Sequence, residues 1–165
     1  MRVSVLWRLF ALLLILTVSS FALETKCVVI GPVASDLKAI ARAAADAQRE
    51  AAQLEAYLRS TSPDWRWVYS QMGILEDHVR SLRRMISAFE RNEPKLTEAQ
   101  ARELERMKAG LATLTLFVNE TYRVLADKRL LWQRNTLTDH ARAMYARARV
   151  IRQAARNLQV VQPAA

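Results

Sequence analysis

The side chains able to do chemistry in this chain are few: His78, His140, one cysteine and 16 carboxylates. A carboxylate-bridged di-iron site in a helical bundle requires Glu-x-x-His on two helices, whereas a leucine stands three residues before each histidine here. One cysteine supplies neither a C-x-x-C redox pair nor a cysteine-rich zinc site, and the three glycines are too scattered for a phosphate-binding loop. The sequence therefore predicts a protein that is not an enzyme and that uses no metal or other cofactor.

Cys27 is the only thiol, so it cannot form a disulfide within one chain. It lies close to the expected mature N-terminus, where we expect it to be accessible. In an oxidising compartment such a thiol either links two copies of the chain or stays free or capped. Cys27 is therefore a candidate residue for self-association.

Positive charge is concentrated at the C-terminal end of the chain. Residues 23–122 hold 14 basic and 14 acidic side chains, whereas residues 123–165 hold nine basic and two acidic ones, a net charge of +7. Arg142, Arg149 and Arg156 recur every seven residues, opposite the apolar side of the last predicted helix. This stripe could bind a phosphate-bearing polymer, anionic lipid headgroups or an acidic protein surface. The alternative is a solvated face in an arginine-rich chain.

Three aromatic side chains, Trp65, Trp67 and Tyr69, lie in the first turns of the second predicted helix. Trp65 belongs to the apolar side of that helix, and Tyr69 flanks it. Trp67 lies off this apolar side. It either covers the end of the bundle beside another helix or is an exposed anchor for a partner; the second role is considered because tryptophan is enriched at binding hot spots.

Four amphipathic segments must position these residues. Each carries apolar side chains at alternating steps of three and four, which predicts helices packed against one another. The predicted apolar seams are Leu37, Ile40, Ala44, Ala47, Ala51, Leu54 and Leu58; Trp65, Val68, Met72, Leu75, Val79, Leu82, Ile86 and Phe89; Leu104, Met107, Leu111, Leu114, Val118, Leu125 and Trp132; and Leu137, Ala141, Met144, Ala148, Ile151, Ala155 and Leu158. We expect the alanines of the first helix to let it approach the second closely.

Short joints between these segments predict an all-α, antiparallel up-down four-helix bundle with coiled-coil-like packing. Ser35 and Ser62 are expected to cap the first two helices, and Thr97 with Gln100 forms a capping box for the third. The last break, at 135–138, contains neither Gly nor Pro. The alternative is therefore three long helices, with the third and fourth continuous.

Residues 1–22 have the features of a cleaved signal peptide, with a basic start, a short apolar run and Ala22 before the cleavage site. An uncleaved membrane anchor is less expected, because the apolar run is shorter than the ~20 residues that span a bilayer. The remaining divisions are a linker at 23–34, the bundle at 35–160 and a disordered tail at 161–165. This organisation predicts export to the periplasm or the exterior of a bacterium.

Together these features predict an exported, non-enzymatic helical bundle that acts as a protein-binding scaffold or as an oligomer subunit. In form it broadly resembles exported helical subunits of bacterial secretion and envelope machinery, although no motif ties it to one family. The alternative function is a basic module that docks on an anionic envelope polymer or membrane surface through its C-terminal arginine-rich helix. Nucleic acid is the least expected partner, because the signal peptide directs the chain out of the cytosol.

Overall fold

The computed structural model describes residues 32–60, 62–92, 96–127 and 130–161. Within them the regular structure is entirely helical: α2 (Pro32–Leu58), α3 (Trp65–Asn92), α4 (Glu98–Ala126) and α5 (Leu130–Val161). None of these helices combines the length and the apolar character needed to cross a membrane. The predicted signal peptide, Cys27 and the end of the tail lie outside the described residues.

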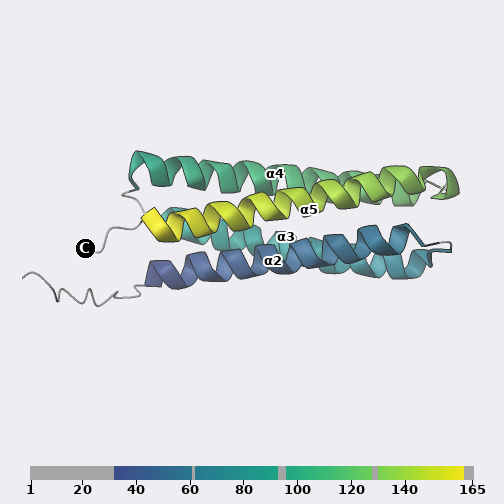
Figure 1. Cartoon of the computed structure of the whole chain (residues 1–165), viewed down its shortest axis with the longest axis horizontal. Helices are drawn as coiled ribbons and strands as arrows, with labels where there is room; N and C mark the ends of the chain where they lie inside the picture. The colour runs from purple at the N-terminus through teal and green to yellow at the C-terminus, as the bar shows by residue number, and fades with distance from the viewer. Residues whose placement is uncertain (1–31, 61, 93–95, 128–129, 162–165) are drawn as a thin grey trace, which may run out of the picture. The chain divides into compact units, whose positions relative to one another are not determined.

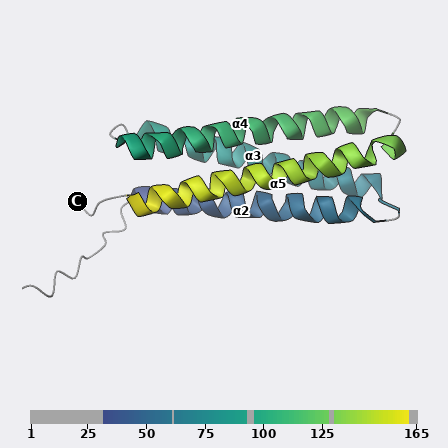
Figure 2. The same cartoon turned by 45° about the horizontal axis from the view of Figure 1, so that its top comes forward.

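The four helices form one bundle within a single compact unit of the chain. Helix α2 packs against α3 and α5, and α4 packs against the same two helices. Successive helices run in opposite directions, and α5 returns between α2 and α4 (Figures 1 and 2). The prediction of an all-α bundle is confirmed.

The core consists of the predicted apolar seams. Apart from Trp65, which is half-buried, every seam residue whose side chain is described is buried. Burial of each larger side chain stabilises the fold by about 1.5–3 kcal/mol. The core also contains Gly110, Thr121 and Ala154, which the seams did not include.

The starts of α2 and α3 differ from the predicted ones. Helix α2 begins at Pro32, three residues before the predicted cap Ser35 and inside the predicted linker. Proline suits a first helical position because its φ is already helical and it needs no hydrogen-bond acceptor. Helix α3 is capped by Asp64 rather than Ser62, since the Asp64 carboxylate accepts from the backbone N–H of Arg66 at 2.9 Å. The capping box of Thr97 and Gln100 at the start of α4 is confirmed.

Helix α4 ends at Ala126 and α5 begins at Leu130, so the predicted break at 135–138 was wrong. Asp127 is the C-cap of α4, with an extended backbone (φ −76°, ψ 129°), which also excludes a continuous helix. The predicted break falls inside α5, where Leu137 is buried and the Thr138 hydroxyl donates to the Arg134 carbonyl at 2.9 Å. Trp132 consequently belongs to α5 and not to the third seam.

Helix α5 makes the most extensive close backbone approach in the bundle, to both α2 and α4, and α3 lies further from its neighbours. The closest backbone approach of α2 is therefore to α5, whereas the sequence predicted a close approach to α3. Small side chains on α5, among them Ala141, Ala148 and Ala155, allow this approach because the distance between helix axes depends on the side chains in the contact. The core of α3, with Met72, Leu82 and Phe89, is bulkier.

The two glycines of the bundle should respond differently to replacement by alanine. A Cβ at Gly73 would meet nothing within 4 Å, so Gly73→Ala should stabilise the fold by about 0.5–1 kcal/mol through helix propensity. A Cβ at Gly110 would lie 3.0 Å from Cγ1 of the buried Ile151. This crowding should offset the gain in helix propensity, so Gly110→Ala should not stabilise the fold. Urea unfolding of both variants measures the difference, and equal stabilisation would contradict the close contact of α4 with α5.

The register of α3 can be tested by truncating one core leucine. Leu82 is fully buried, so Leu82→Ala should cost about 2–5 kcal/mol by leaving a cavity. Leu116 of α4 is 53% exposed, and Leu116→Ala should change stability by less than about 0.5 kcal/mol. The free energies of unfolding would refute this register if the two variants proved equally stable.

Candidate functional site

Helix α5 is the most basic element of the bundle, with six arginines and one acidic residue, Asp139. Its position against α2 is marked by contacts from three of these arginines. Arg134 donates to the Arg59 carbonyl at 3.1 Å, Arg142 to the Glu55 carboxylate at 3.2 Å, and Arg152 to the Gln48 side chain at 3.3 Å. These contacts run along one side of the bundle. We call this surface the α2–α5 edge; it comprises Gln48 and Glu55 of α2, Arg59 directly after α2, and Arg134, Arg142, Arg149, Arg152 and Arg156 of α5.

Most basic side chains of α4, and several of α2 and α3, have carboxylate partners. The paired ones are Arg49, Arg59, Arg80, Arg102, Arg106, Lys108 and Arg123. On α5 only Arg142 forms an ion pair within the described residues, with Glu55 and Asp139. Arg149 and Arg156 are exposed, as predicted, and no described carboxylate lies within ion-pair distance of either. The positive charge of α5 is therefore largely uncompensated by this part of the chain.

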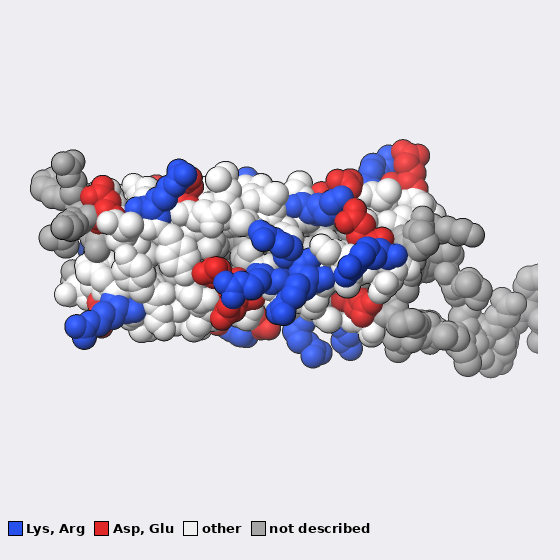
Figure 3. Space-filling view, turned by 180° about the vertical axis from the view of Figure 1, so that it is seen from behind, with Lys and Arg blue, Asp and Glu red and all other residues white. Residues whose placement is uncertain are grey.

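The face seen in Figure 3 carries charged side chains of both signs. Lys and Arg side chains there lie beside Asp and Glu side chains at several places (Figure 3). Arg80 contacts Glu76 and Asp77 of its own helix, α3. The hydrogen bonds that Lys108 donates to Glu90 and Glu105 raise its pKa above the usual value, so this amine stays protonated beside its partners. Neutralisation within the fold makes such groups less available to an external anion.

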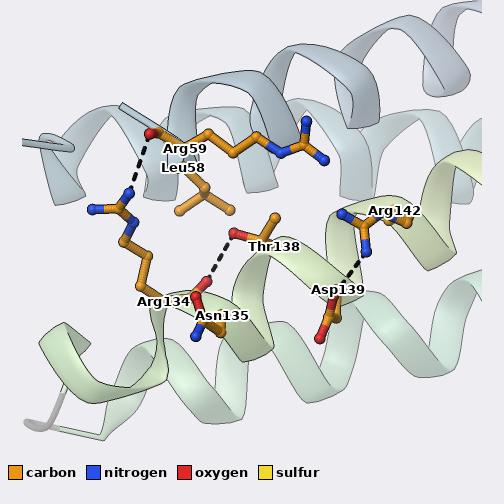
Figure 4. A pocket seen from close by; sticks show the side chains of 7 residues that line it. All are labelled: Leu58, Arg59, Arg134, Asn135, Thr138, Asp139 and Arg142. Carbon is orange, nitrogen blue, oxygen red and sulfur yellow. Dashed lines mark hydrogen bonds and ion pairs between the residues drawn. The ribbon is translucent and has the colours of Figure 1, made fainter. Parts of the chain in front are cut away.

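An open hollow of about 380 Å³ lies at the end of the α2–α5 edge, where α2 finishes. Its lining residues are Leu58, Arg59, Arg134, Asn135, Thr138, Asp139 and Arg142. Figure 4 shows the guanidinium of Arg134 at one end and those of Arg59 and Arg142 toward the other, with Leu58 and Thr138 between them. The hollow therefore combines a buried apolar floor with positive charge at both ends.

Two sets of contacts hold these guanidinium groups in place. Glu55 is largely buried, with a side chain 19% exposed, and its Oε1 accepts from both Arg59 at 2.6 Å and Arg142 at 3.2 Å. Arg142 is also bound by Asp139 at 3.1 Å. Arg134 donates to a carbonyl at the C-terminal end of α2, where cations are favoured by the helix dipole. The arrangement suits the binding of an oxyanion, since arginine presents several N–H donors in a fixed plane.

Trp67 is half-buried and lies against Tyr57 of α2, with ring centroids 3.9 Å apart and planes inclined by 37°. The Tyr57 hydroxyl in turn accepts from the backbone N–H of Asp64 at 2.9 Å. Trp67 therefore covers the end of the bundle beside another helix, the first of the two roles allowed by the sequence. A contact between Trp67 and a partner stays a prediction.

Large exposed apolar side chains occur singly on α3 and α4: Tyr69, Ile74 and Leu116. Tyr69 also has a structural role, because its hydroxyl donates to the Leu125 carbonyl near the end of α4 at 2.6 Å. Scattered apolar side chains of this kind are ordinary on protein surfaces. The predicted candidates Arg142, Arg149 and Arg156 share the α2–α5 edge, whereas Trp67 lies on α3.

Between α4 and α5 a polar contact is present that the sequence did not reveal. Thr121 is fully buried, and its hydroxyl donates to the Phe117 carbonyl at 2.6 Å. The Thr121 oxygen can then accept from Nδ1–H of neutral His140, which lies 3.3 Å away. The His140 ring also lies against Phe117, with centroids 5.7 Å apart. His140 is therefore part of the interface between α4 and α5.

Burial lowers the pKa of His140 below its usual value, and the nearby Glu120 and Asp139 oppose this shift. Among the described residues, no group of three or more His, Cys, Asp or Glu side chains is placed to hold a metal ion. His140 is thus best treated as a neutral contact residue at pH 7.

Acid should weaken the fold through His140. The unfolded chain binds a proton at the ordinary pKa of about 6.5 and the folded chain only at a lower one, so stability should decrease as the pH falls through that window. The urea midpoint measured at about pH 7.5 and about pH 5 should show a smaller decrease for His140→Gln than for the unchanged protein. The variant His78→Gln keeps His140 and should retain the decrease; an unchanged pH dependence in His140→Gln would contradict the assignment.

Comparison of the chain with models of protein families, with curated proteins and with solved structures finds no match. A functional assignment must therefore come from the residues and their geometry.

Proposed function

We propose that this protein is a non-enzymatic binding module that attaches to an anionic partner through the α2–α5 edge. The predicted signal peptide supports export, and the periplasm or the exterior of a bacterium is the proposed location. The partner is an anionic envelope component rather than a nucleic acid. Attachment is largely electrostatic, so its strength falls as salt screens the charges.

The observation that carries this proposal is the uncompensated charge of α5. Arg149 and Arg156 are exposed and have no ion pair within the described residues. All four basic residues of α4, by contrast, are paired with carboxylates: Arg102, Arg106, Lys108 and Arg123. Several unpaired positive charges along one helix create a positive potential that attracts and orients an anion. Pairs such as Arg102 with Glu98 create little external field.

Attachment to a protein through Trp67, the other function considered, has less support. Tyr57 already covers part of the indole ring, so less of Trp67 is available as an anchor. Self-association through Cys27 concerns a residue outside the described part of the chain. An acidic protein surface remains within the proposal, because it would use the same arginines.

Loss of two α5 arginines should weaken binding to anionic surfaces. Each basic residue near such a surface contributes about 1 kcal/mol, so Arg149→Gln with Arg156→Gln should reduce affinity for phosphatidylglycerol-containing vesicles by roughly 30-fold. The matched control, Arg102→Gln with Arg123→Gln on α4, removes the same charge from ion-paired side chains that are 71% and 79% exposed. We expect it to change affinity by less than about threefold, since it acts only through screened long-range charge.

Vesicle co-sedimentation at low and physiological salt measures both effects. Equal losses in the two double variants would show that net charge alone matters and would contradict a binding edge. Binding that resists salt would also contradict the proposal and would direct attention to an apolar contact such as Trp67.

A further inference from the structure

We propose that the partner is a linear polyanion that lies lengthwise along the α2–α5 edge, with one of its anionic groups held in the arginine-lined hollow. This inference rests on the proposed function and specifies the class of ligand. It is carried by the spacing of the α5 arginines and by the shape and charge of the hollow.

The arginines form a row along the axis of α5. Arg134, Arg142, Arg149 and Arg156 follow one another at intervals of eight, seven and seven residues. With a rise of about 1.5 Å per residue, the intervals are about 12, 10.5 and 10.5 Å, and the row is about 33 Å long. The contacts of Arg134 and Arg142 with α2 place the first part of this row on the α2 side of the helix. A row of separated cations matches a chain that carries anionic groups at intervals.

The hollow favours a chain over a flat membrane surface. Its floor contains Leu58, which is 0% exposed, and the half-buried Thr138, and both lie between the guanidinium groups shown in Figure 4. A bilayer surface would contact the outermost arginine heads and leave this recess empty. A single polymer chain is narrow enough to enter it, and the volume of about 380 Å³ is within the range of small-ligand sites.

The three guanidinium groups of the hollow retain capacity for a ligand. Each has five N–H donors; in the described part of the chain Arg59 and Arg134 each donate one side-chain hydrogen bond and Arg142 donates two. Glu55 and Asp139 reduce the local charge, but three arginines against two carboxylates leave it positive. Because Glu55 and Asp139 also fix Arg59 and Arg142, the donors are oriented before an oxyanion arrives, which lowers the entropic cost of binding.

The test is binding of the purified protein to inorganic polyphosphate chains of defined length. Affinity should rise with length until a chain spans the row of about 33 Å and should then level off, because longer chains make no further contact. Arg59→Gln with Arg134→Gln should weaken binding of long chains at least tenfold and lessen the salt dependence, because fewer counterions are released. Asp139→Asn removes the exposed acid of the hollow, and Glu55 still holds Arg142 in place, so this variant should bind more tightly.

The control for the hollow is again Arg102→Gln with Arg123→Gln, which should bind long chains nearly as the unchanged protein does. Arg134 caps α2, so thermal unfolding of the hollow variant is measured in parallel; if it fails to fold, Asp139→Asn and the length series decide the question. Affinity independent of chain length, or an Asp139→Asn variant that binds no more tightly, would overturn the inference.

Vesicles containing phosphatidylglycerol separate this inference from the proposed function. The vesicle affinity should depend on Arg149 and Arg156 but little on Arg59 and Arg134, because a bilayer does not enter the hollow. If vesicle binding falls in the α5 variant while polyphosphate binding shows no length dependence, the edge binds a membrane surface and the polyanion inference is wrong. If the α5 variant retains both activities, the proposed function fails as well.

Discussion

The structure depends on the close approach of α5 to two helices at once. This approach is possible because the facing positions hold small residues, among them Ala44, Ala141 and Ala148, and because Gly110 of α4 leaves space for Ile151. Because one side of α5 is buried against α2 and α4, its charged side chains can lie only on the opposite, exposed side. The basic edge is thus a geometric result of the alanine-rich core, while α3, with bulkier core residues, completes the bundle at a greater distance.

Much of the fold could be predicted because a heptad pattern reports directly which side of a helix is buried. The four seams and the capping box of Thr97 are examples. Helix ends were less predictable: Ser62 and Asp64 are both good caps, and only the folded backbone selects Asp64. The 135–138 segment looked like a break because threonine favours caps, yet Thr138 satisfies its hydroxyl on the preceding turn. The contact between buried Thr121 and half-buried His140 gave no signal in the sequence, since each residue alone is compatible with a surface position.

The candidate site likewise has a part that could be predicted from the sequence and a part that could not. The exposed side of α5 followed from periodicity, and Arg149 and Arg156 lie there as expected. The hollow could not be predicted, because it needs Arg59 and Arg134, which are 75 residues apart and meet only through the packing of α2 on α5. Glu55 illustrates the same limit: its role as a shared acceptor for Arg59 and Arg142 depends on which turn of α5 lies opposite it. Pairing across helices is a property of register, which composition and spacing within one helix do not report.

The small side chains between α5 and its neighbours have a consequence for the α2–α5 edge. Small side chains offer little resistance to one helix sliding lengthwise over another, so the axial position of α5 must be fixed by a few discrete pairs. Ile151 against Gly110, His140 against Thr121 and Arg134 on the end of α2 are among the contacts that can do so. A slip of α5 by one heptad would bring Arg149 or Asn135 opposite Glu55 in place of Arg142 and would separate Arg134 from the end of α2. The charge pattern of the edge therefore depends on the axial position of α5, and contacts within the bundle such as that of Ile151 with Gly110 help to determine which charges the surface presents.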